Sequence, residues 1–275
     1  MTALFATDLD RTMIFSRNAF HGADAVEKEC VEYYEGEPLS YMTTTAVARL
    51  RELAAIAPVI PTTTRTIEQF QRIHLPGAPW PFAITSNGGN ILVDGIPDPA
   101  WRLSIDEQVN ATGATLASVG AELRSRIDGS WVSKYREADE LFCYLVVRPE
   151  AVPSGFLAEW DTWCRANGWS ASQQGRKIYT MPDAVCKSLA VAEVRRRLTE
   201  SGELREGAHL FAAGDGALDA QMLKAADAAI RPRHGELEEL AFTAPNLTVT
   251  ESSGILAGAE ILAWFHAALP LADPV

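Results

Sequence analysis

The chain has 275 residues, which is enough for one large domain or two smaller ones. Its 36 acidic and 24 basic side chains give a formal net charge of −12. This charge argues against a nucleic-acid partner, because phosphate backbones are bound by clustered Lys and Arg. It leaves a small anionic ligand open, since a metal ion and a few local cations can reverse the charge inside a cleft. The four cysteines are scattered without a C-x-x-C pair, which favours isolated thiols over a disulfide frame or a zinc site.

The N-terminal residues carry no basic segment followed by a long apolar stretch, so we expect no signal peptide. The most apolar segment, residues 254–269, contains Glu260 and His266 and predicts a terminal helix that packs on the core, not a membrane span. These features predict a cytoplasmic protein without a membrane partner. The sequence does not indicate the oligomeric state.

The apolar run at residues 3–7 predicts a buried strand, and two carboxylates, Asp8 and Asp10, follow it directly. Residues two apart on a strand face the same side, and ligands of parallel α/β sheets bind at the carboxyl ends of the strands. Two carboxylates this close repel each other unless a cation or a proton joins them. The alternative is a simple polar turn in which Asp10 caps a helix.

The next segments predict a hairpin within residues 16–40, around Glu35-Gly36, and a helix at 43–57 with a threonine cap. A short buried strand at 59–60 then leads into a run of hydroxyls that includes Thr63. Such hydroxyls can bind phosphate oxygens or cap the helix expected at 67–74, and the two roles are compatible.

A third buried strand is expected at 82–85, ending in a polar turn with Asn87, and residues 91–95 predict the return arm of a hairpin. From about residue 97 to 176 the composition changes, and five of the seven tryptophans lie there. The pattern predicts a helix at 105–127, strands at 131–135 and 141–147, and a helix at 154–167. We therefore expect an inserted α+β cap domain at residues 91–177, and a discontinuous core at 1–90 and 178–275.

Lys187 lies at the start of a helix expected at 183–198, where the helix dipole disfavours a cation, so either it serves the site or it is an exposed lysine that tolerates the penalty. A buried strand at 209–213 then ends in a turn with Asp215 and Asp219. Segments 228–230 and 247–250 predict short edge strands. If the sheet is parallel, the four polar turns share one edge, and their carboxylates need a hard cation such as Mg²⁺.

The same residues resemble the motifs of the haloacid dehalogenase (HAD) superfamily in the right order. The matches are Asp8-Leu9-Asp10-Arg11-Thr12 to D-x-D-x-T, Thr63-Thr64-Arg65 to T-G-R, Lys187 to the third-motif lysine, and the turn at 214–219 to G-D-x-x-x-D. The long gap before Lys187 is where the Cof-type and sucrose-phosphatase-like branches insert a class II cap. The resemblance implies an α/β fold with a Rossmann-like parallel sheet and an inserted α+β cap that closes over the site and selects the leaving group.

The resemblance also implies roles for the catalytic residues. Asp8 would attack phosphorus to form an aspartyl-phosphate, and Asp10 would serve as the general acid and base. Thr63 and Lys187 would bind the phosphoryl oxygens and offset their charge.

Mg²⁺ would be held by Asp8, by the backbone carbonyl of Asp10 and by Asp215, with Asp219 as a ligand or in contact with one. Asn87 and Arg65 would bind substrate. Three positions depart from the family pattern, namely Arg11, Thr64 and Leu218, and they stand where many members have Gly, Gly and Asn.

The predicted function is therefore a Mg²⁺-dependent phosphoric monoester hydrolase that acts on a small phosphorylated metabolite of the sugar phosphate class. Alternatives are a phosphotransferase or phosphomutase of the same superfamily and a non-catalytic protein that binds a phosphorylated ligand. A phospho-accepting receiver domain would also place acids and a lysine around Mg²⁺, but the length of the chain and the inserted segment argue against it.

Overall fold

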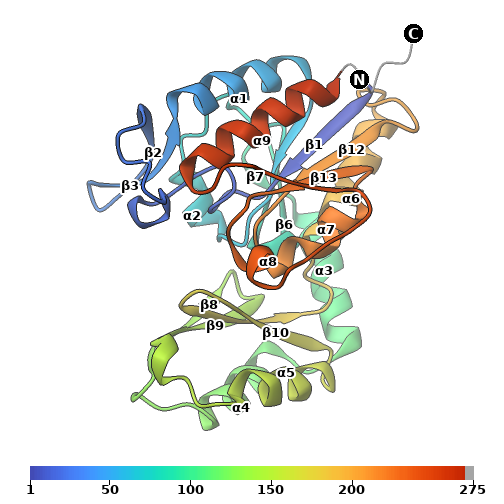
Figure 1. Ribbon diagram of the computed structural model, residues 1–275. Helices are drawn as coiled ribbons and strands as arrows, with labels where there is room; N and C mark the ends of the chain where they lie inside the picture. The colour runs from blue at the N-terminus through green and yellow to red at the C-terminus, as the bar shows by residue number, and fades with distance from the viewer. Residues whose placement is uncertain (270–275) are drawn as a thin grey trace. The chain divides into compact units, whose positions relative to one another are not determined.

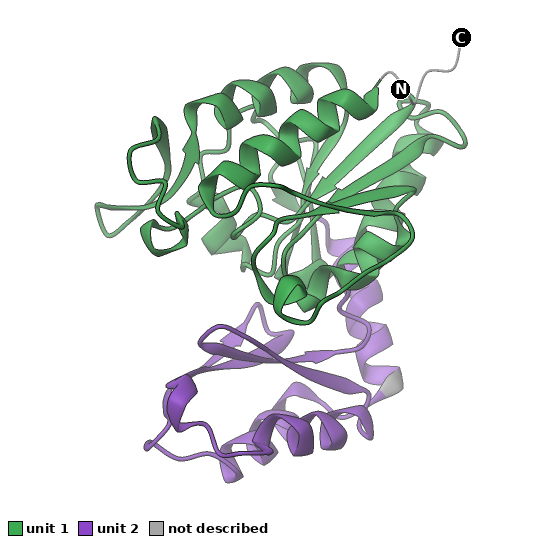
Figure 2. Ribbon diagram, viewed as in Figure 1, with its two compact units in different colours: residues 1–97, 187–275 green, residues 98–186 purple. Residues whose placement is uncertain are grey.

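The computed structural model describes residues 1–269, and the chain divides into two compact units (Figure 2). The first unit, called here the core unit, comprises Met1–Pro97 and the chain from Lys187 onward. The second, the inserted unit, is Asp98–Cys186. The predicted fold class, α/β with a parallel core sheet and an inserted α+β unit, is confirmed.

The core sheet has five parallel strands in the order β14-β13-β12-β1-β4 (Figure 1). Their bounds are Leu247–Val249, Ala228–Arg231, His209–Ala213, Ala3–Thr7 and Val59–Pro61. The prediction of an edge strand at 228–230 was wrong, because β13 lies between β12 and β14. Every residue of β1 and β4 is buried, as expected for strands that helices cover on both faces.

Helices cover both faces of this sheet. On one face α1 (Thr44–Ile56) and α9 (Ile255–Ala268) pack side by side, and Phe5 of β1 contacts Phe265 of α9 with ring centroids 4.9 Å apart (Figure 1). On the other face lie α6 (Lys187–Glu200) and α7 (Ala220–Ala225). Thr43 caps α1 by accepting a hydrogen bond from the backbone N–H of Ala46, as the sequence predicted.

Smaller elements connect these layers. The predicted hairpin is β2 (Lys28–Tyr34) paired with β3 (Glu37–Thr43). The helix α2 (Ile67–Gln71), which follows β4, is shorter than expected. The strands β5 (Phe82–Thr85), β6 (Asn90–Val93) and β7 (Ile96–Pro97) form a separate antiparallel sheet. A parallel bridge between Thr62 and Ile84 joins β5 to the segment after β4. Single 3₁₀ turns occur at Arg17–Ala19, Ser86–Gly88 and Ala217–Asp219.

The inserted unit has a four-stranded antiparallel sheet in the order β10-β11-β9-β8. The strands span Trp169–Gln174, Lys177–Pro182, Phe142–Val147 and Val132–Ala138, and the helices α3, α4 and α5 span Pro99–Thr112, Leu116–Ser125 and Phe156–Arg165. A 3₁₀ turn at Pro149–Ala151 follows β9.

The single helix predicted at 105–127 is in fact two helices, α3 and α4, that meet at Gly113. A Cβ atom at Gly113 would lie 2.1 Å from the carbonyl oxygen of Asn167, so the chain passes too close to the neighbouring backbone to hold a side chain there. Thr115 then starts α4 by accepting a hydrogen bond from the N–H of Ser118. The sequence prediction read through this break because the apolar spacing continues across it.

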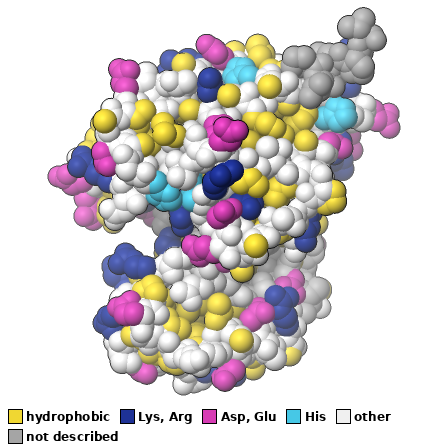
Figure 3. All heavy atoms as spheres, viewed as in Figure 1, with side chains coloured by type: hydrophobic (Ala, Val, Ile, Leu, Met, Phe, Trp, Pro, Cys, Tyr) yellow, Lys and Arg dark blue, Asp and Glu magenta, His cyan; other side chains and the backbone are white. Residues whose placement is uncertain are grey.

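Among residues 1–269, none of the helices is long and apolar enough to cross a membrane. On the face drawn in Figure 3, acidic and basic side chains are interspersed instead of being gathered by sign.

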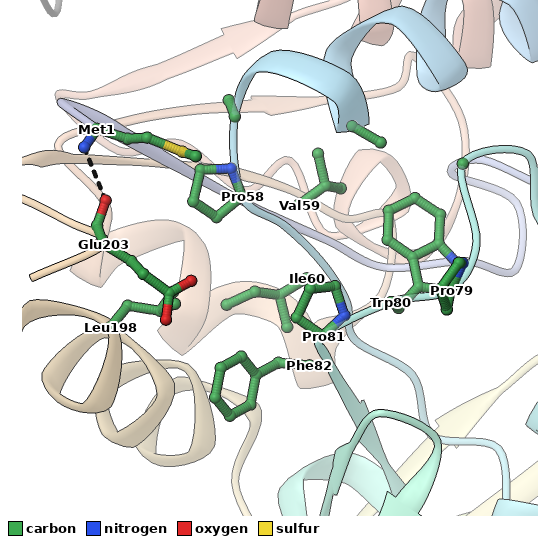
Figure 4. A pocket seen from close by; sticks show the side chains of 13 residues that line it. Met1, Pro58, Val59, Ile60, Pro79, Trp80, Pro81, Phe82, Leu198 and Glu203 are labelled. Carbon is green, nitrogen blue, oxygen red and sulfur yellow. Dashed lines mark hydrogen bonds between the residues drawn. The ribbon is translucent and has the colours of Figure 1, made fainter. Parts of the chain in front are cut away.

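An apolar cavity of about 120 Å³ lies at the amino end of β1 and β4, lined among others by Met1, Pro58, Trp80 and Leu198 (Figure 4). Glu203 also lines it, and the Met1 ammonium group donates a hydrogen bond of 2.7 Å to the carbonyl of Glu203. Because ligands of parallel sheets bind at the carboxyl ends of the strands, this cavity is not part of the site described next.

Candidate active site

The register of the core sheet places the polar turns at one edge. Thr7, the last residue of β1, pairs with Ala213, the last residue of β12, so Asp8 and the turn containing Asp215 leave the sheet at the same level. The backbone N–H of Asp8 donates to the carbonyl of Ala213 at 2.9 Å. On the other side of β1, the N–H of Thr62 donates to the carbonyl of Thr7 at 2.8 Å, which brings Thr63 to this edge as well.

Lys187 joins two of the carboxylates. Its Nζ lies 2.6 Å from Oδ1 of Asp8 and 2.6 Å from Oδ1 of Asp219, and all three side chains are buried. The alternative of an exposed lysine is therefore wrong, since Lys187 is 1% exposed. Burial opposes its charge, but the carboxylates of Asp219 and Asp8 raise the pKa of Lys187 above its ordinary value.

Asp219 is held in place from its own turn. Its Oδ2 accepts a hydrogen bond of 2.9 Å from the N–H of Gly216. A Cβ atom at Gly214 would lie 2.5 Å from the Asp219 carboxylate carbon, so a glycine there lets the side chain fold back against the strand end. Leu218, the departure from the family pattern, does not disturb this contact.

Asp215 differs from the other two acids, because neither of its carboxylate oxygens has a hydrogen-bond partner although both are buried. Burial, with the nearby charges of Asp8 and Asp219, raises its pKa well above the ordinary value. Burial likewise raises the pKa of Asp8 to about 7, against the lowering effect of Lys187. Orphaned buried carboxylate oxygens are costly, so this site requires a positive partner.

A metal ion fits that requirement. Carboxylate oxygens of Asp8, Asp215 and Asp219 all lie within 4.8 Å of one another. The ammonium group of Lys187 contacts two of the three carboxylates, and hard carboxylate oxygens are the ligands that Mg²⁺ prefers. The buried trio is thus suited to a divalent cation beside Asp215, whose carboxylate oxygens accept no hydrogen bond.

The turn after Asp8 is fixed by backbone contacts and by one histidine. Arg11 has a positive φ of 63°, and its carbonyl is 2.7 Å from Nε2 of His234. Nδ1 of His234 accepts a hydrogen bond from the N–H of Gly254, so Nε2 carries the proton that it donates to Arg11. The Arg11 side chain turns toward the acids, with Nε 3.6 Å from Oδ2 of Asp215.

Asp10 is not part of the buried trio of aspartates and is paired with Arg65. The guanidinium grips the carboxylate with two parallel hydrogen bonds of 2.7 Å, from Nε and from Nη2. Arg65 donates a third, from Nη1, to Glu32 at 2.7 Å. Burial opposes the charge of Arg65, but Asp10 and Glu32 raise its pKa. In the structure Arg65 therefore contacts the proposed acid–base residue.

Thr63 and Asn87 are brought together at the neighbouring strand end. Both are buried, and the N–H of Asn87 donates to the carbonyl of Thr63 at 2.9 Å. Asn87 has a positive φ of 58°, a conformation that asparagine tolerates better than most residues. The Thr63 hydroxyl accepts a hydrogen bond from the N–H of Arg65 at 3.1 Å, which sets the direction of the chain into α2.

Comparison with solved structures shows which fold this chain has. The sucrose-phosphatase from Synechocystis, solved in complex with sucrose and phosphate, matches with a TM-score of 0.67 at 14% identity, over 97% of this chain and 98% of that one. A HAD subclass IIB sugar phosphatase matches with a TM-score of 0.57 at 12% identity, over 97% and 99%. The chain has the HAD fold. A HAD phosphatase from Bacteroides thetaiotaomicron also matches, with a TM-score of 0.53 at 13% identity over 97% and 95%.

The predicted resemblance to the HAD superfamily is thereby confirmed at the level of the fold, over nearly the full chain. No family model matches the sequence, and no curated protein matches it. The chain combines the fold of HAD subclass IIB phosphatases with a buried trio of aspartates.

Sequence reasoning missed three residues that shape this site. His234 holds the turn at Arg11, Glu32 contacts Arg65, and Gly235 lies against Asp215, where a Cβ atom would come within 2.4 Å of Oδ2. The sequence signalled only one of the three, Glu32, as a charged residue in a predicted strand. Charged residues on strands usually face solvent, so this signal did not point to the site.

Proposed function

We propose that this protein is a Mg²⁺-dependent phosphatase that hydrolyses a small phosphorylated metabolite of the sugar phosphate class. The observation that carries the proposal is the buried group of Asp8, Asp215 and Asp219 at the carboxyl edge of the sheet, with Lys187 bridging Asp8 and Asp219. A phosphate monoester brings its own negative charge, so a site that binds it must hold cations beside its nucleophile.

Asp8 is the proposed nucleophile. One of its carboxylate oxygens forms a bond to phosphorus, the bond between phosphorus and the leaving oxygen breaks, and Asp10 gives a proton to that oxygen. In the second half Asp10 takes a proton from water, the water oxygen attacks phosphorus, and orthophosphate leaves with the Asp8 carboxylate restored.

The other residues stabilise charge and hold positions. Lys187 is 2.6 Å from Asp8 and can balance charge on the phosphoryl oxygens as they approach, and Thr63 offers a hydroxyl at the same edge. Mg²⁺ bound by Asp8, Asp215 and Asp219, with the Asp10 carbonyl as a further ligand, would neutralise the phosphate dianion. Asn87 is proposed to orient the phosphate or the leaving group.

The test is release of orthophosphate from a panel of phosphorylated metabolites, with and without Mg²⁺, by the wild type and by Asp8→Asn. The expected result is metal-dependent release that the variant abolishes while its circular dichroism spectrum stays unchanged. Asp94→Asn, which alters an exposed aspartate, is the matched control and should retain full activity.

Two results would redirect the proposal. Loss of substrate without orthophosphate, with the phosphoryl group found on a second sugar, would indicate a phosphotransferase or mutase. Binding of phosphorylated metabolites with no turnover by the wild type would indicate a non-catalytic binding protein.

A further inference from the structure

Glu32 is a carboxylate buried in an unusual place. It lies in β2, whose following residues Tyr33 and Tyr34 are 51% and 47% exposed, whereas Glu32 itself is 0% exposed. A carboxylate taken fully out of water is unfavourable unless charged or hydrogen-bonded partners surround it. The Glu32 carboxylate therefore needs charged or hydrogen-bonding partners inside the protein.

An irregularity in the hairpin turns this side chain inward. The pairing of β2 with β3 shifts its register on both sides of Glu32, between Cys30 and Glu32 and between Glu32 and Tyr33. Val31 and Glu32 are consequently both buried, which breaks the alternation of a regular strand. Such bulges are a common way to redirect one side chain beside a functional site.

Both oxygens of Glu32 have partners. Oε1 accepts a hydrogen bond of 2.7 Å from Nη1 of Arg65, and Nη2 of Arg72 lies 3.7 Å from the same oxygen. Oε2 accepts a hydrogen bond of 2.5 Å from the hydroxyl of Ser40 in β3. One oxygen of the carboxylate is thus held by Ser40 of the same hairpin, and the other accepts the hydrogen bond from Arg65.

Arg65 in turn holds Asp10. Its Nε and Nη2 form the two-pronged contact with the Asp10 carboxylate, while Nη1 is occupied by Glu32. Arginine presents its donors in a rigid plane, so fixing Nη1 also fixes the direction in which Nε and Nη2 point. The chain of contacts runs from Ser40 through Glu32 and Arg65 to Asp10.

We propose that Glu32 is a positioning residue for proton transfer by Asp10: through Arg65 it sets where the Asp10 carboxylate stands relative to the leaving oxygen. This inference rests on the proposed phosphatase function. The β2–β3 hairpin then contributes to the acid–base step, because it supplies both Glu32 and Ser40, whose hydroxyl holds Glu32.

The test uses the dependence of turnover on the leaving group. Phenyl phosphate and 4-nitrophenyl phosphate are alike in size, but phenolate leaves far less readily and needs its proton more. In Glu32→Ala we expect kcat/KM for phenyl phosphate to fall by about tenfold or more, a part of the roughly 10²–10⁴-fold that acid–base catalysis contributes. For 4-nitrophenyl phosphate the fall should be less than about threefold, because that ester depends least on the acid.

Conservative and control variants separate positioning from folding. Glu32→Gln keeps an oxygen facing Nη1 of Arg65 and should recover most of the phenyl phosphate turnover. Ser40→Ala removes the hydroxyl that holds Glu32 but leaves the Glu32 carboxylate in place. Its kcat/KM should fall less than that of Glu32→Ala, and again more for phenyl phosphate than for 4-nitrophenyl phosphate. This variant keeps the test usable if Glu32→Ala fails to fold. Glu68→Ala removes a carboxylate near Arg72 whose side chain is 88% exposed, and it should leave kcat/KM for both esters unchanged.

The outcomes are distinguishable. An equal fall on both esters in folded variants would show that Glu32 acts only on the structure, and would overturn this inference while leaving the phosphatase function intact. Absence of orthophosphate release by the wild type from both aryl esters and from the whole panel of phosphorylated metabolites would remove the proposed function, and the role of Glu32 would fall with it.

Discussion

Lys187 Nζ lies 2.6 Å from the Oδ1 atoms of both Asp8 and Asp219, so a single buried ammonium group bridges two buried carboxylates. The third acid, Asp215, has no hydrogen-bond donor at either carboxylate oxygen. The lysine is therefore the counter-charge of Asp8 and Asp219, whereas the cation beside Asp215 is the partly exposed guanidinium of Arg11, 3.6 Å away.

This relationship predicts a large stability loss for Lys187→Met. Removing one member of a buried charged group leaves the others uncompensated, so the free energy of unfolding without metal should fall by about 3–5 kcal/mol. Added Mg²⁺ should restore part of the loss, because a divalent cation replaces the missing positive charge. Urea unfolding with and without Mg²⁺ measures both effects.

Lys134→Met is the control for Lys187→Met, because Lys134 is exposed, and it should shift stability by no more than about 0.5 kcal/mol. If Lys187→Met were as stable as the wild type in the absence of Mg²⁺, the site would not need the lysine as its counter-charge.

Gly235→Ala is expected to weaken metal binding without removing any ligand. Gly235 precedes α8 (Glu236–Glu239), and a Cβ atom there would lie 2.4 Å from Oδ2 of Asp215, which forces the carboxylate aside. Mg²⁺ at about 100 times its dissociation constant should stabilise the wild type by about 2.7 kcal/mol. The variant should lose most of that gain, read as the Mg²⁺-dependent rise in Tm.

Gly95→Ala is the control for Gly235→Ala, because it introduces a similar backbone strain. The two glycines have φ values of +91° and +80°, but a Cβ at Gly95 meets nothing within 4 Å. Gly95→Ala should therefore lose stability through strain alone and keep the full response to Mg²⁺. An undiminished metal response in Gly235→Ala would mean that Asp215 does not bind the ion.

The strands and their polar ends could be predicted from the sequence because both are local signals. Apolar runs mark β1, β4 and β12, and the parallel arrangement then brings Asp8, Asp215 and Lys187 to one edge. The break at Gly113 could not be predicted, because it depends on the backbone of Asn167 in a distant segment.

The supporting contacts of the site were hidden for the same physical reason. His234 contacts Arg11 although the two residues are 223 positions apart in the sequence. The inward direction of the Glu32 side chain depends on a register shift between β2 and β3, which the residue pattern does not indicate. The sequence does not determine the direction of the Arg11 side chain, and the structure turns it toward Asp215.

That direction predicts a competition between Arg11 and the metal ion. Arg11 Nε is 3.6 Å from Oδ2 of Asp215, with 36% of the side chain exposed, so the cation is partly screened by solvent. Arg11→Ala should tighten Mg²⁺ binding by about fivefold, which corresponds to about 1 kcal/mol for a screened charge pair. Isothermal titration calorimetry measures the change, with the exposed Arg51→Ala as the control. Weaker binding in Arg11→Ala would instead indicate that Arg11 supports the metal site.

His234 predicts how stability depends on pH. Its imidazole is 6% exposed, donates from Nε2 to Arg11 and accepts at Nδ1 from Gly254, and both contacts require the neutral form. Burial lowers its pKa to about 4 from the ordinary 6.5. Between these values the unfolded chain binds a proton that the folded protein excludes, so the histidine's contribution is complete above pH 6.5 and is lost as the pH falls toward 4.

The depressed pKa corresponds to about 3 kcal/mol of stability lost across that window. The raised pKa values of Asp8 and Asp215 act on stability in the opposite direction, and they are common to the wild type and His234→Gln. Urea unfolding at intervals from pH 7.5 to 4 should therefore show the wild type losing about 3 kcal/mol relative to His234→Gln, since glutamine takes up no proton. His209→Gln, which alters an imidazole with a 48% exposed side chain, should keep the wild-type slope. If His234→Gln retained the full slope, other groups would carry the acid sensitivity, and His234 would not hold the turn at Arg11 through its neutral tautomer.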